Sequence, residues 1–209
     1  IHLINHSIVV PALNKFFSGI PKELGIERLD ESELERALPF LRRCLDAAVD
    51  GVRMELTEIQ RQELDQTLWR DLEAFVRIEA SSRLPLVPSR YEVSFGHERS
   101  TLGGLDLGQG LTLAGKIDRV DVETLGARGI VQDYKSGRSA HSAAQITQEQ
   151  RLQIPLYMLV LRDLVGIEPL GGVYRALAGA RMTRGLLHAE AADEALFKFA
   201  EDVKNRLDR

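Results

Sequence analysis

Hydrophobic and polar residues follow two different periods along this chain, and the change of period divides it into two parts. The first part contains a long amphipathic stretch from about Val52 to Ser82. A helical period of this kind predicts a mostly helical segment over residues 1–85. Residues 86–209 contain shorter runs of β-branched and apolar residues, which predict strands.

Two of these apolar runs predict a hairpin. They cover Leu111 to Val122 and Gly129 to Tyr134, and the short segment between them, which contains Gly126, suits a hairpin loop. The remaining elements that we expect are a strand near Arg90 to Phe95, a helix near Thr147 to Val165, a strand near Gly171 to Leu177 and a terminal helix from Asp193. Helices that flank a small mixed sheet place the chain in the α/β class.

The ends of the two hairpin strands carry the first chemical signal. Because strand side chains alternate between faces, Asp133 and Lys135 share one face and Tyr134 points to the other. Asp118 lies across from this pair if the hairpin register brings it there. Two carboxylates and an ammonium group form a site for a hard divalent cation and an anionic substrate. The alternative is a solvated strand end with a surface ion pair, because such pairs are common and weak.

Three ordered motifs favour the first interpretation. The chain reads GKIDRVD from Gly115, VQDYKSG from Val131 and LQIPLY from Leu152. In this order and spacing, the motifs strongly resemble the RecB-like branch of the PD-(D/E)xK nuclease superfamily, of the AddB/RecB C-terminal nuclease domain type. The resemblance covers about Glu92 to Leu177, and three motifs together are more specific than any one of them. It implies a restriction-endonuclease-like core.

The resemblance also implies a set of catalytic residues. Asp118 and Asp133 would bind Mg²⁺ or Mn²⁺, and the backbone carbonyl of Tyr134 would add a further oxygen, which agrees with the preference of these ions for oxygen ligands. Lys135 would orient the attacking water and offset charge in the transition state. The reaction is then phosphodiester hydrolysis by metal-activated water. Glycosidases also use two carboxylates, but they have no comparable need for the lysine.

Four further residues receive supporting or DNA-binding roles. Gln153 and Tyr157 are four residues apart, so on a helix they share a face and can meet one substrate group. For Tyr157 the simpler alternative is packing in the core with its hydroxyl at the rim. Pro155, between them, should perturb the helical hydrogen bonds. Arg119 and Asp121 flank the first ligand, and we interpret them as supporting ion-pair partners rather than as metal ligands.

One feature of the resembled family has no clean match in the sequence. Many RecB-like nucleases carry a histidine on an early helix as an additional metal ligand, and no histidine of this chain stands in that context. Glu73 or Glu79 could replace it with a carboxylate, although a solvated position on the helix is the simpler explanation for either. Glu92, in RYEVSF, resembles the glutamate of an E-x-x-F strand in the family; we assign it a structural role, with a role at the site as the alternative.

Length and composition fit a single compact nuclease domain over residues 1–209. With 209 residues and 44% hydrophobic content, the chain can bury one sizeable core. No apolar run approaches the roughly 18 residues that span a bilayer, and no signal-peptide pattern is present, so we predict no membrane partner. The one cysteine, Cys44, excludes a four-cysteine metal site within the chain, and it fits a buried position in a cytoplasmic protein.

The net charge of −4 contrasts with the basic surface that nucleic-acid-binding proteins normally present. Acidic residues are frequent in the helical stretches, and a basic groove on an otherwise acidic body is compatible with the sequence. The arginines that could line such a groove are Arg83, Arg90, Arg99, Arg138, Arg151, Arg175, Arg181 and Arg184.

Two functions follow from these observations. The first is a Mg²⁺- or Mn²⁺-dependent DNA nuclease, an exonuclease on DNA ends or single strands, in recombination or repair. RecB-like nucleases often form the C-terminal domain of a helicase–nuclease polypeptide, so we expect this chain to be a piece of a longer protein with a helicase domain or subunit as its partner. The second is a nuclease-like module that binds DNA or a partner protein without cutting it.

Overall fold

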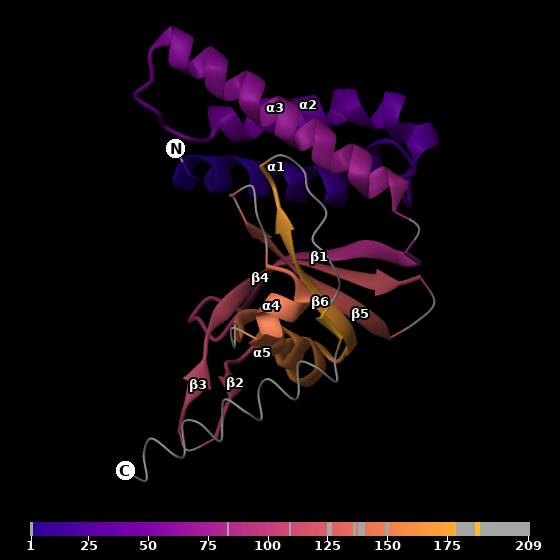
Figure 1. Cartoon of the computed structure of the whole chain (residues 1–209), viewed down its shortest axis with the longest axis vertical. Coiled ribbons are helices and arrows are strands. Elements are labelled where there is room, and N and C mark those ends of the chain that lie inside the picture. The colour runs from indigo at the N-terminus through magenta and orange to yellow at the C-terminus, as the bar shows by residue number, and fades with distance from the viewer. Residues whose placement is uncertain are drawn as a thin grey trace. The chain divides into compact units, whose positions relative to one another are not determined.

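The computed structural model describes residues 2–82, 84–108, 110–124, 127–135, 137, 141–148, 151–178 and 187–188. Within these residues, a group of helices is followed by a mixed sheet with two helices inserted between its strands (Figure 1). The mixed α/β architecture with a helical N-terminal part is confirmed, and it is consistent with a restriction-endonuclease-like fold.

The chain divides into two compact units, and each unit is assembled from segments that are not consecutive. One unit takes residues 1–87, 134–140 and 175–182, and the other takes residues 88–133, 141–174 and 183–209. A single nuclease domain over residues 1–209 stays a prediction.

Helices form most of the first unit (Figure 1). They are α1 (His2–Glu23), the short 3-10 helix η1 (Glu31–Glu33), α2 (Leu34–Asp50) and α3 (Glu58–Ser81). Their apolar faces meet in a core that includes Phe16, Leu41 and Leu72, all almost fully buried. Helix α3 starts later than the predicted Val52 because Thr57 and Gln60 form a capping box, in which each side chain accepts a bond from the other residue's backbone N–H.

Within the described residues, the sheet has five strands in the order β1-β4-β5-β6-β7. The strands are β1 (Leu86–Phe95), β4 (Gly115–Glu123), β5 (Arg128–Lys135), β6 (Glu168–Ala176) and β7 (Leu187–His188). β4 and β5 form the predicted hairpin and are antiparallel, as are β6 and β7. A separate small hairpin, β2 (Leu105–Asp106) with β3 (Thr112–Leu113), precedes β4.

Strands β5 and β6 are parallel. The N–H of Glu168 donates to the carbonyl of Ala127 at 2.8 Å, and the N–H of Leu177 donates to the carbonyl of Lys135 at 2.9 Å, so the bonded residues ascend together along both strands. A parallel pair needs a long crossover, usually helical. Here it contains α4 (Ala143–Gln148), α5 (Gln153–Val160) and a π-helical extension, η2 (Leu161–Val165).

The crossover corrects two predictions. The single helix expected near Thr147 to Val165 is wrong, because α4 ends at Gln148 and α5 starts at Gln153. Pro155 does not perturb α5, because it lies in the first turn, where a backbone N–H has no acceptor within the helix. The terminal helix expected from Asp193 lies outside the described residues.

Two other expectations concern burial and membranes. The side chain of Cys44 is fully buried, as predicted, and burial raises the pKa of its thiol to about 11. None of the helices in the described part of the chain combines the length and the apolar character that crossing a bilayer requires.

A glycine allows α5 to pack closely on the sheet. A Cβ atom on Gly172 of β6 would lie 2.4 Å from Cγ2 of Ile154 and 2.7 Å from Cγ2 of Val131. Real Cβ atoms do not approach other carbons this closely, so any side chain at this position pushes the start of α5 away from β5 and β6. Ile154 directly follows Gln153 in α5, so the same contact also fixes the position of Gln153.

We expect Gly172→Ala to destabilise the protein by about 1–3 kcal/mol, because overpacking forces the helix or the strand to shift. Gly103→Ala is the matched control, since a Cβ there meets no atom within 4 Å. Urea denaturation of both variants measures the difference. Equal midpoints for Gly172→Ala and the parent would contradict the close packing of α5.

Candidate active site

The register of the β4–β5 hairpin aligns the two predicted carboxylates. Its ladder pairs Arg119 with Gln132. One residue further along the same antiparallel register, Asp118 of β4 lies opposite Asp133 of β5. Residues directly opposite each other project to the same face, with Cβ atoms roughly 4.5–5.5 Å apart. The hairpin therefore brings the two carboxylates together on one face of the sheet.

Both carboxylates are buried, with 6% of Asp118 and 4% of Asp133 exposed. Like charges directly opposite each other on a sheet repel, and burial removes part of the hydration of each. A cation between them offsets both costs, and oxygen donors suit Mg²⁺ or Mn²⁺. Within the described residues no group of three or more His, Cys, Asp or Glu side chains could hold a metal. The donor set therefore fits a hard ion that completes its coordination with water, backbone or substrate oxygens.

Lys135 ends strand β5, two residues after Asp133, and its side chain is half-buried. Alternation along the strand places both side chains on the same face. Tyr134 projects to the other face, where its ring is 2% exposed and packs edge-on against Phe75 of α3, with 5.8 Å between ring centroids. The Tyr134 ring is thus part of the core, and only its backbone is a candidate for the site.

Helix α5 reaches the second carboxylate through Gln153. Nε2 of Gln153 donates to Oδ1 of Asp133 at 2.7 Å and to the hydroxyl oxygen of Tyr157 at 3.1 Å. The hydroxyl of Tyr174, in β6, donates to Oε1 of Gln153 at 3.3 Å. The ring of Tyr157 packs edge-on against Phe95, with 6.3 Å between ring centroids. The ring of Tyr157 is therefore packed while its hydroxyl bonds within the polar cluster, and a DNA-binding role for Tyr157 stays a prediction.

The two tyrosine hydroxyls keep their protons at neutral pH. Burial raises the pKa of Tyr157; the bond from Gln153 acts against this, and the negative charges of Asp133 and Asp118 add to it. Burial, followed by the charge of Asp133, raises the pKa of Tyr174 to about 12. Since both aspartates influence Tyr157, its hydroxyl and the two carboxylates share one electrostatic environment.

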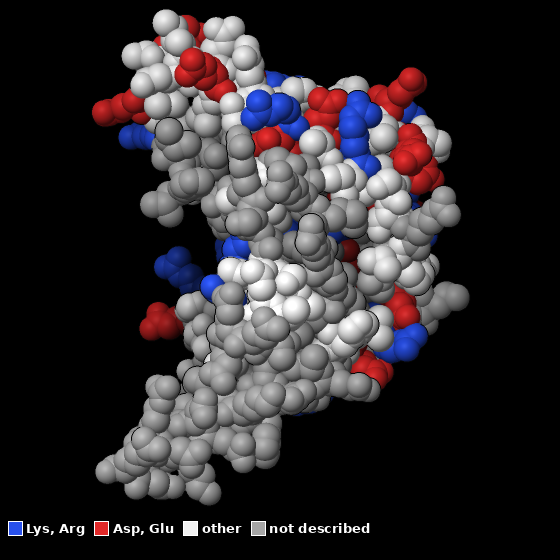
Figure 2. Space-filling model, viewed as in Figure 1, with Lys and Arg blue, Asp and Glu red and all other residues white. Residues whose placement is uncertain are grey.

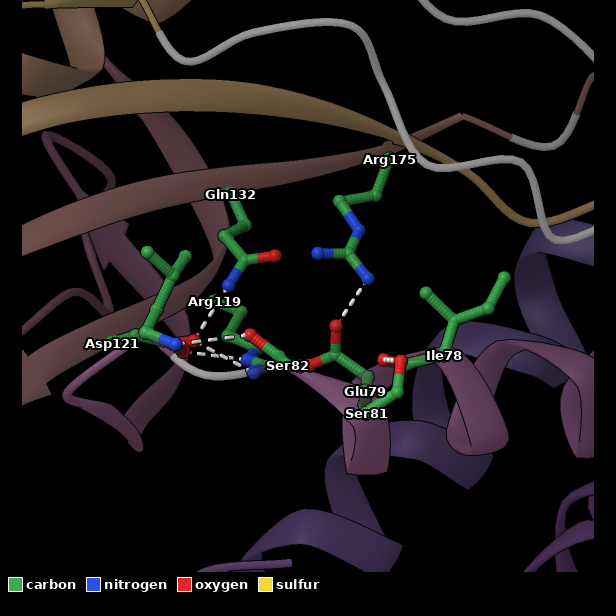
Figure 3. Close-up of polar contacts among 9 residues, drawn as sticks. Ile78, Glu79, Ser81, Ser82, Arg119, Asp121, Gln132 and Arg175 are labelled. Carbon is green, nitrogen blue, oxygen red and sulfur yellow. Dashed lines mark hydrogen bonds and ion pairs between the residues drawn. The ribbon is translucent and has the colours of Figure 1, made fainter. Parts of the chain in front are cut away.

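A second polar cluster lies on the opposite face of the same hairpin (Figure 3). Nε and Nη2 of Arg119 donate to the two carboxylate oxygens of Asp121 at 2.5 and 2.7 Å, and Nε2 of Gln132 donates to Asp121 at 2.6 Å. All three residues are at most 4% exposed. Alternation directs them away from the face of Asp118 and Asp133. They therefore cross-link β4 to β5 from behind the carboxylate pair.

Glu92 of β1 has an unusual backbone. Its φ of 47° is the only positive φ of a residue other than glycine within the described part of the chain. Its side chain pairs with Nζ of Lys116 at 2.6 Å, and both side chains are 44–49% exposed. An ion pair this exposed contributes little to stability. A role of Glu92 at the site stays a prediction.

The two glutamates considered as substitutes for the missing histidine both pair with arginines. Glu73 pairs with Arg77 one turn later on α3, at 2.7 Å. Glu79 forms an ion pair with Arg175, and their side chains are only 9% and 11% exposed (Figure 3). The guanidinium of Arg175 also lies over the ring of Phe75, 4.9 Å from its centroid. Glu79 is therefore not a solvated helix residue, and Arg175 is committed to a buried pair rather than to a basic groove.

Charges on the helices are mixed in sign. Figure 2 shows acidic and basic side chains intermixed over the helical part in this view. Several of them form ion pairs with one another, such as Arg42 with Asp46 and with Asp65, at 2.7 and 2.6 Å. Four of the arginines expected in a basic groove lie outside the described residues, namely Arg83, Arg138, Arg181 and Arg184.

Two residues of these clusters, Gln132 and Tyr174, could not be predicted from sequence patterns. Gln132 interrupts an apolar run in β5, and a lone amide in a buried strand is a weak sign of a buried network. Tyr174 occurs in GGVYRA, which has no motif spacing that links it to Gln153. Their partners became apparent only from the sheet order and from the position of α5.

Comparison with known proteins identifies a family. The sequence pattern of the PD-(D/E)XK nuclease superfamily matches residues 11–209. The matched range contains all three motifs, with Asp118, Asp133 and Lys135. No curated protein sequence matches the chain.

We expect Asp121→Asn to destabilise the protein by about 3–5 kcal/mol, because it removes the carboxylate charge that pairs through both its oxygens with the buried guanidinium of Arg119. Glu123→Gln is the matched control, since Glu123 pairs with Arg128 at 2.7 Å in the same hairpin but at an exposed position. It should cost about 1 kcal/mol or less. Urea denaturation measures both, and similar losses would contradict a special role for the buried cluster.

Proposed function

Since the chain belongs to the PD-(D/E)XK nuclease superfamily, we propose that it is a metal-dependent deoxyribonuclease that hydrolyses phosphodiester bonds with Asp118, Asp133 and Lys135. The observation that supports this most strongly is the hairpin register, which sets two buried carboxylates opposite each other on adjacent strands. Without a cation, the repulsion within such a pair destabilises the fold; with a cation, the two carboxylates act as metal ligands.

The residues take the following roles. Asp118, Asp133 and the backbone carbonyl of Tyr134 would hold Mg²⁺ or Mn²⁺, which would supply Lewis-acid polarisation of the phosphate and lower the pKa of a water molecule. Lys135 orients the attacking water and offsets the negative charge that develops on the phosphate. Gln153 holds Asp133 through the 2.7 Å bond to Oδ1.

Tyr157 acts as a hydrogen-bond donor to the DNA backbone. Its oxygen accepts a bond from Gln153, so its own proton is directed away from that amide. Its raised pKa keeps the hydroxyl protonated, and a neutral hydroxyl is tolerated beside an anionic phosphate where a phenolate is not. Arg119 and Asp121 support the site indirectly, because they fix the strand that carries Asp118.

The three motifs support a more specific proposal for the DNA substrate, the cellular process and the compartment. The RecB-like character of GKIDRVD, VQDYKSG and LQIPLY supports DNA ends or single strands as substrate, cut in the exonuclease mode, in recombination or repair in the cytoplasm. It also supports a helicase domain or subunit as the partner. Glu92 is kept as a second candidate for contact with substrate because its backbone conformation is strained.

A nuclease-like module that binds DNA without cutting it is the second candidate. It is favoured by the ligand set within the described residues, where no third His, Cys, Asp or Glu joins the two aspartates. Glu79, the more buried substitute for the missing histidine, is paired with Arg175. Two carboxylates with a lysine are nevertheless what metal-assisted hydrolysis requires, and we therefore place the enzyme first.

We expect the chain to cleave end-labelled single- or double-stranded DNA in the presence of Mg²⁺ or Mn²⁺. Asp118→Asn and Asp133→Asn should abolish cleavage, because each removes a metal ligand. Lys135→Ala should reduce it by about 100-fold or more, as expected for loss of a charge that stabilises the transition state. Asp163→Asn is the control, since Asp163 forms an exposed ion pair with Arg162.

The same assay separates the two candidates. Product sizes from linear and circular DNA distinguish an exonuclease from an endonuclease. If the parent protein binds DNA in a gel-shift assay but leaves it intact with either metal, the non-cutting module is correct and the proposed activity is wrong.

A further inference from the structure

The bonds around Gln153 point to a role for a tyrosine that lies outside all three motifs. We propose that Tyr174 is a positioning residue, which orients the amide of Gln153 so that its NH₂ group, and not its carbonyl, faces Asp133. The inference rests on the proposed function, because orienting Gln153 matters for catalysis only if Asp133, to which Gln153 bonds, binds a metal ion. The four residues of this cluster belong to one compact unit; they are Asp133, Gln153, Tyr157 and Tyr174.

The two ends of the Gln153 amide have different partners. Oε1 accepts from the hydroxyl of Tyr174 at 3.3 Å, and Nε2 donates to Oδ1 of Asp133 at 2.7 Å. An ionised carboxylate can only accept, so only the NH₂ end of the amide can bond to it. If the amide turned end for end, its carbonyl oxygen would face the carboxylate and repel it. A donor at Oε1 therefore selects the useful orientation.

Tyr174 is suited to be that donor. Its side chain is 2% exposed, and its ring packs edge-on against His141, with 5.9 Å between ring centroids. Burial and the charge of Asp133 raise the pKa of its hydroxyl to about 12, so it stays protonated over the working pH range. Strand β6 places it beside α5, and the close approach at Gly172 brings α5 onto the same strand.

The orientation of the Gln153 amide affects the carboxylate of Asp133. A carboxylate with one oxygen held by a fixed donor cannot rotate freely about its Cβ–Cγ bond. Outer-sphere partners of this kind orient metal-binding carboxylates, and their loss commonly weakens metal affinity by about 10- to 100-fold. Tyr174 acts on Asp133 through Gln153, and its bond is long for an O–H···O contact, so the expected effect lies at the lower end of that range.

Tyr174→Phe removes the hydroxyl and keeps the ring that packs on His141. We expect Mn²⁺, titrated into the protein and followed by calorimetry, to bind this variant about 10-fold more weakly than the parent. In a Gln153→Ala background, Tyr174→Phe should have no further effect, because the amide that it orients is gone. A full effect of Tyr174→Phe in that background would overturn the proposal.

A readout without metal separates this proposal from the proposed function. The side-chain NH₂ signals of Gln153 in ¹H–¹⁵N NMR, assigned by their loss in Gln153→Ala, report the orientation of the amide directly. We expect slow exchange with water in the parent and faster exchange and shifted signals in Tyr174→Phe. Unchanged signals would overturn the role of Tyr174, whether or not the parent binds Mn²⁺ or cuts DNA. Altered signals in Tyr174→Phe, together with a parent that neither binds Mn²⁺ nor cuts DNA, would support the role of Tyr174 and contradict the proposed nuclease.

Discussion

The register between β4 and β5 is the constraint on which the candidate site depends. A shift by one residue turns every side chain of a strand to the other face, and a shift by two moves Asp118 away from Asp133, so the two lie opposite each other only in this alignment. Two features hold it: the apolar residues of both strands, which are buried, and the cluster of Arg119, Asp121 and Gln132 on the reverse face. Buried polar groups are costly unless they are bonded, so a slipped register would leave this cluster unsatisfied. The energy that secures the hairpin thereby also secures the juxtaposition of two negative charges.

Around this hairpin, each side of the site is set by a different element. Helix α5 supplies Gln153 and Tyr157, and β6 supplies Tyr174 and the glycine that lets α5 approach. Separately, in the first compact unit, Phe75 of α3 packs against Tyr134, and Glu79 of α3 pairs with Arg175. These contacts hold the ends of β5 and β6, and Lys135 follows Tyr134 directly. Residues without a proposed catalytic role therefore help to position the residues of the candidate site.

The sequence predicted the elements whose signal is local. The hairpin was apparent because two apolar runs flank a glycine-containing turn, and the first helices because of their period. The break between α4 and α5 was missed, since no glycine or proline separates them, and Pro155 was misinterpreted because its effect depends on its distance from the helix start. The pair of Glu79 with Arg175 spans 96 residues of sequence, and no local pattern predicts it. The roles of Asp118, Asp133 and Lys135 came from ordered motifs, whereas Tyr174 could be found only once β6 was placed beside α5.

The proposed function requires that Asp118 and Asp133 bind one divalent cation together. The decisive measurement is Mn²⁺ binding to the parent, Asp118→Asn, Asp133→Asn and the double variant, by calorimetry and by electron paramagnetic resonance of the bound ion. We expect one ion per chain, a large loss of affinity in either single variant, and no further loss in the double variant, because the two ligands act as a unit. Losses that add independently, or a stoichiometry unaffected by either substitution, would contradict it.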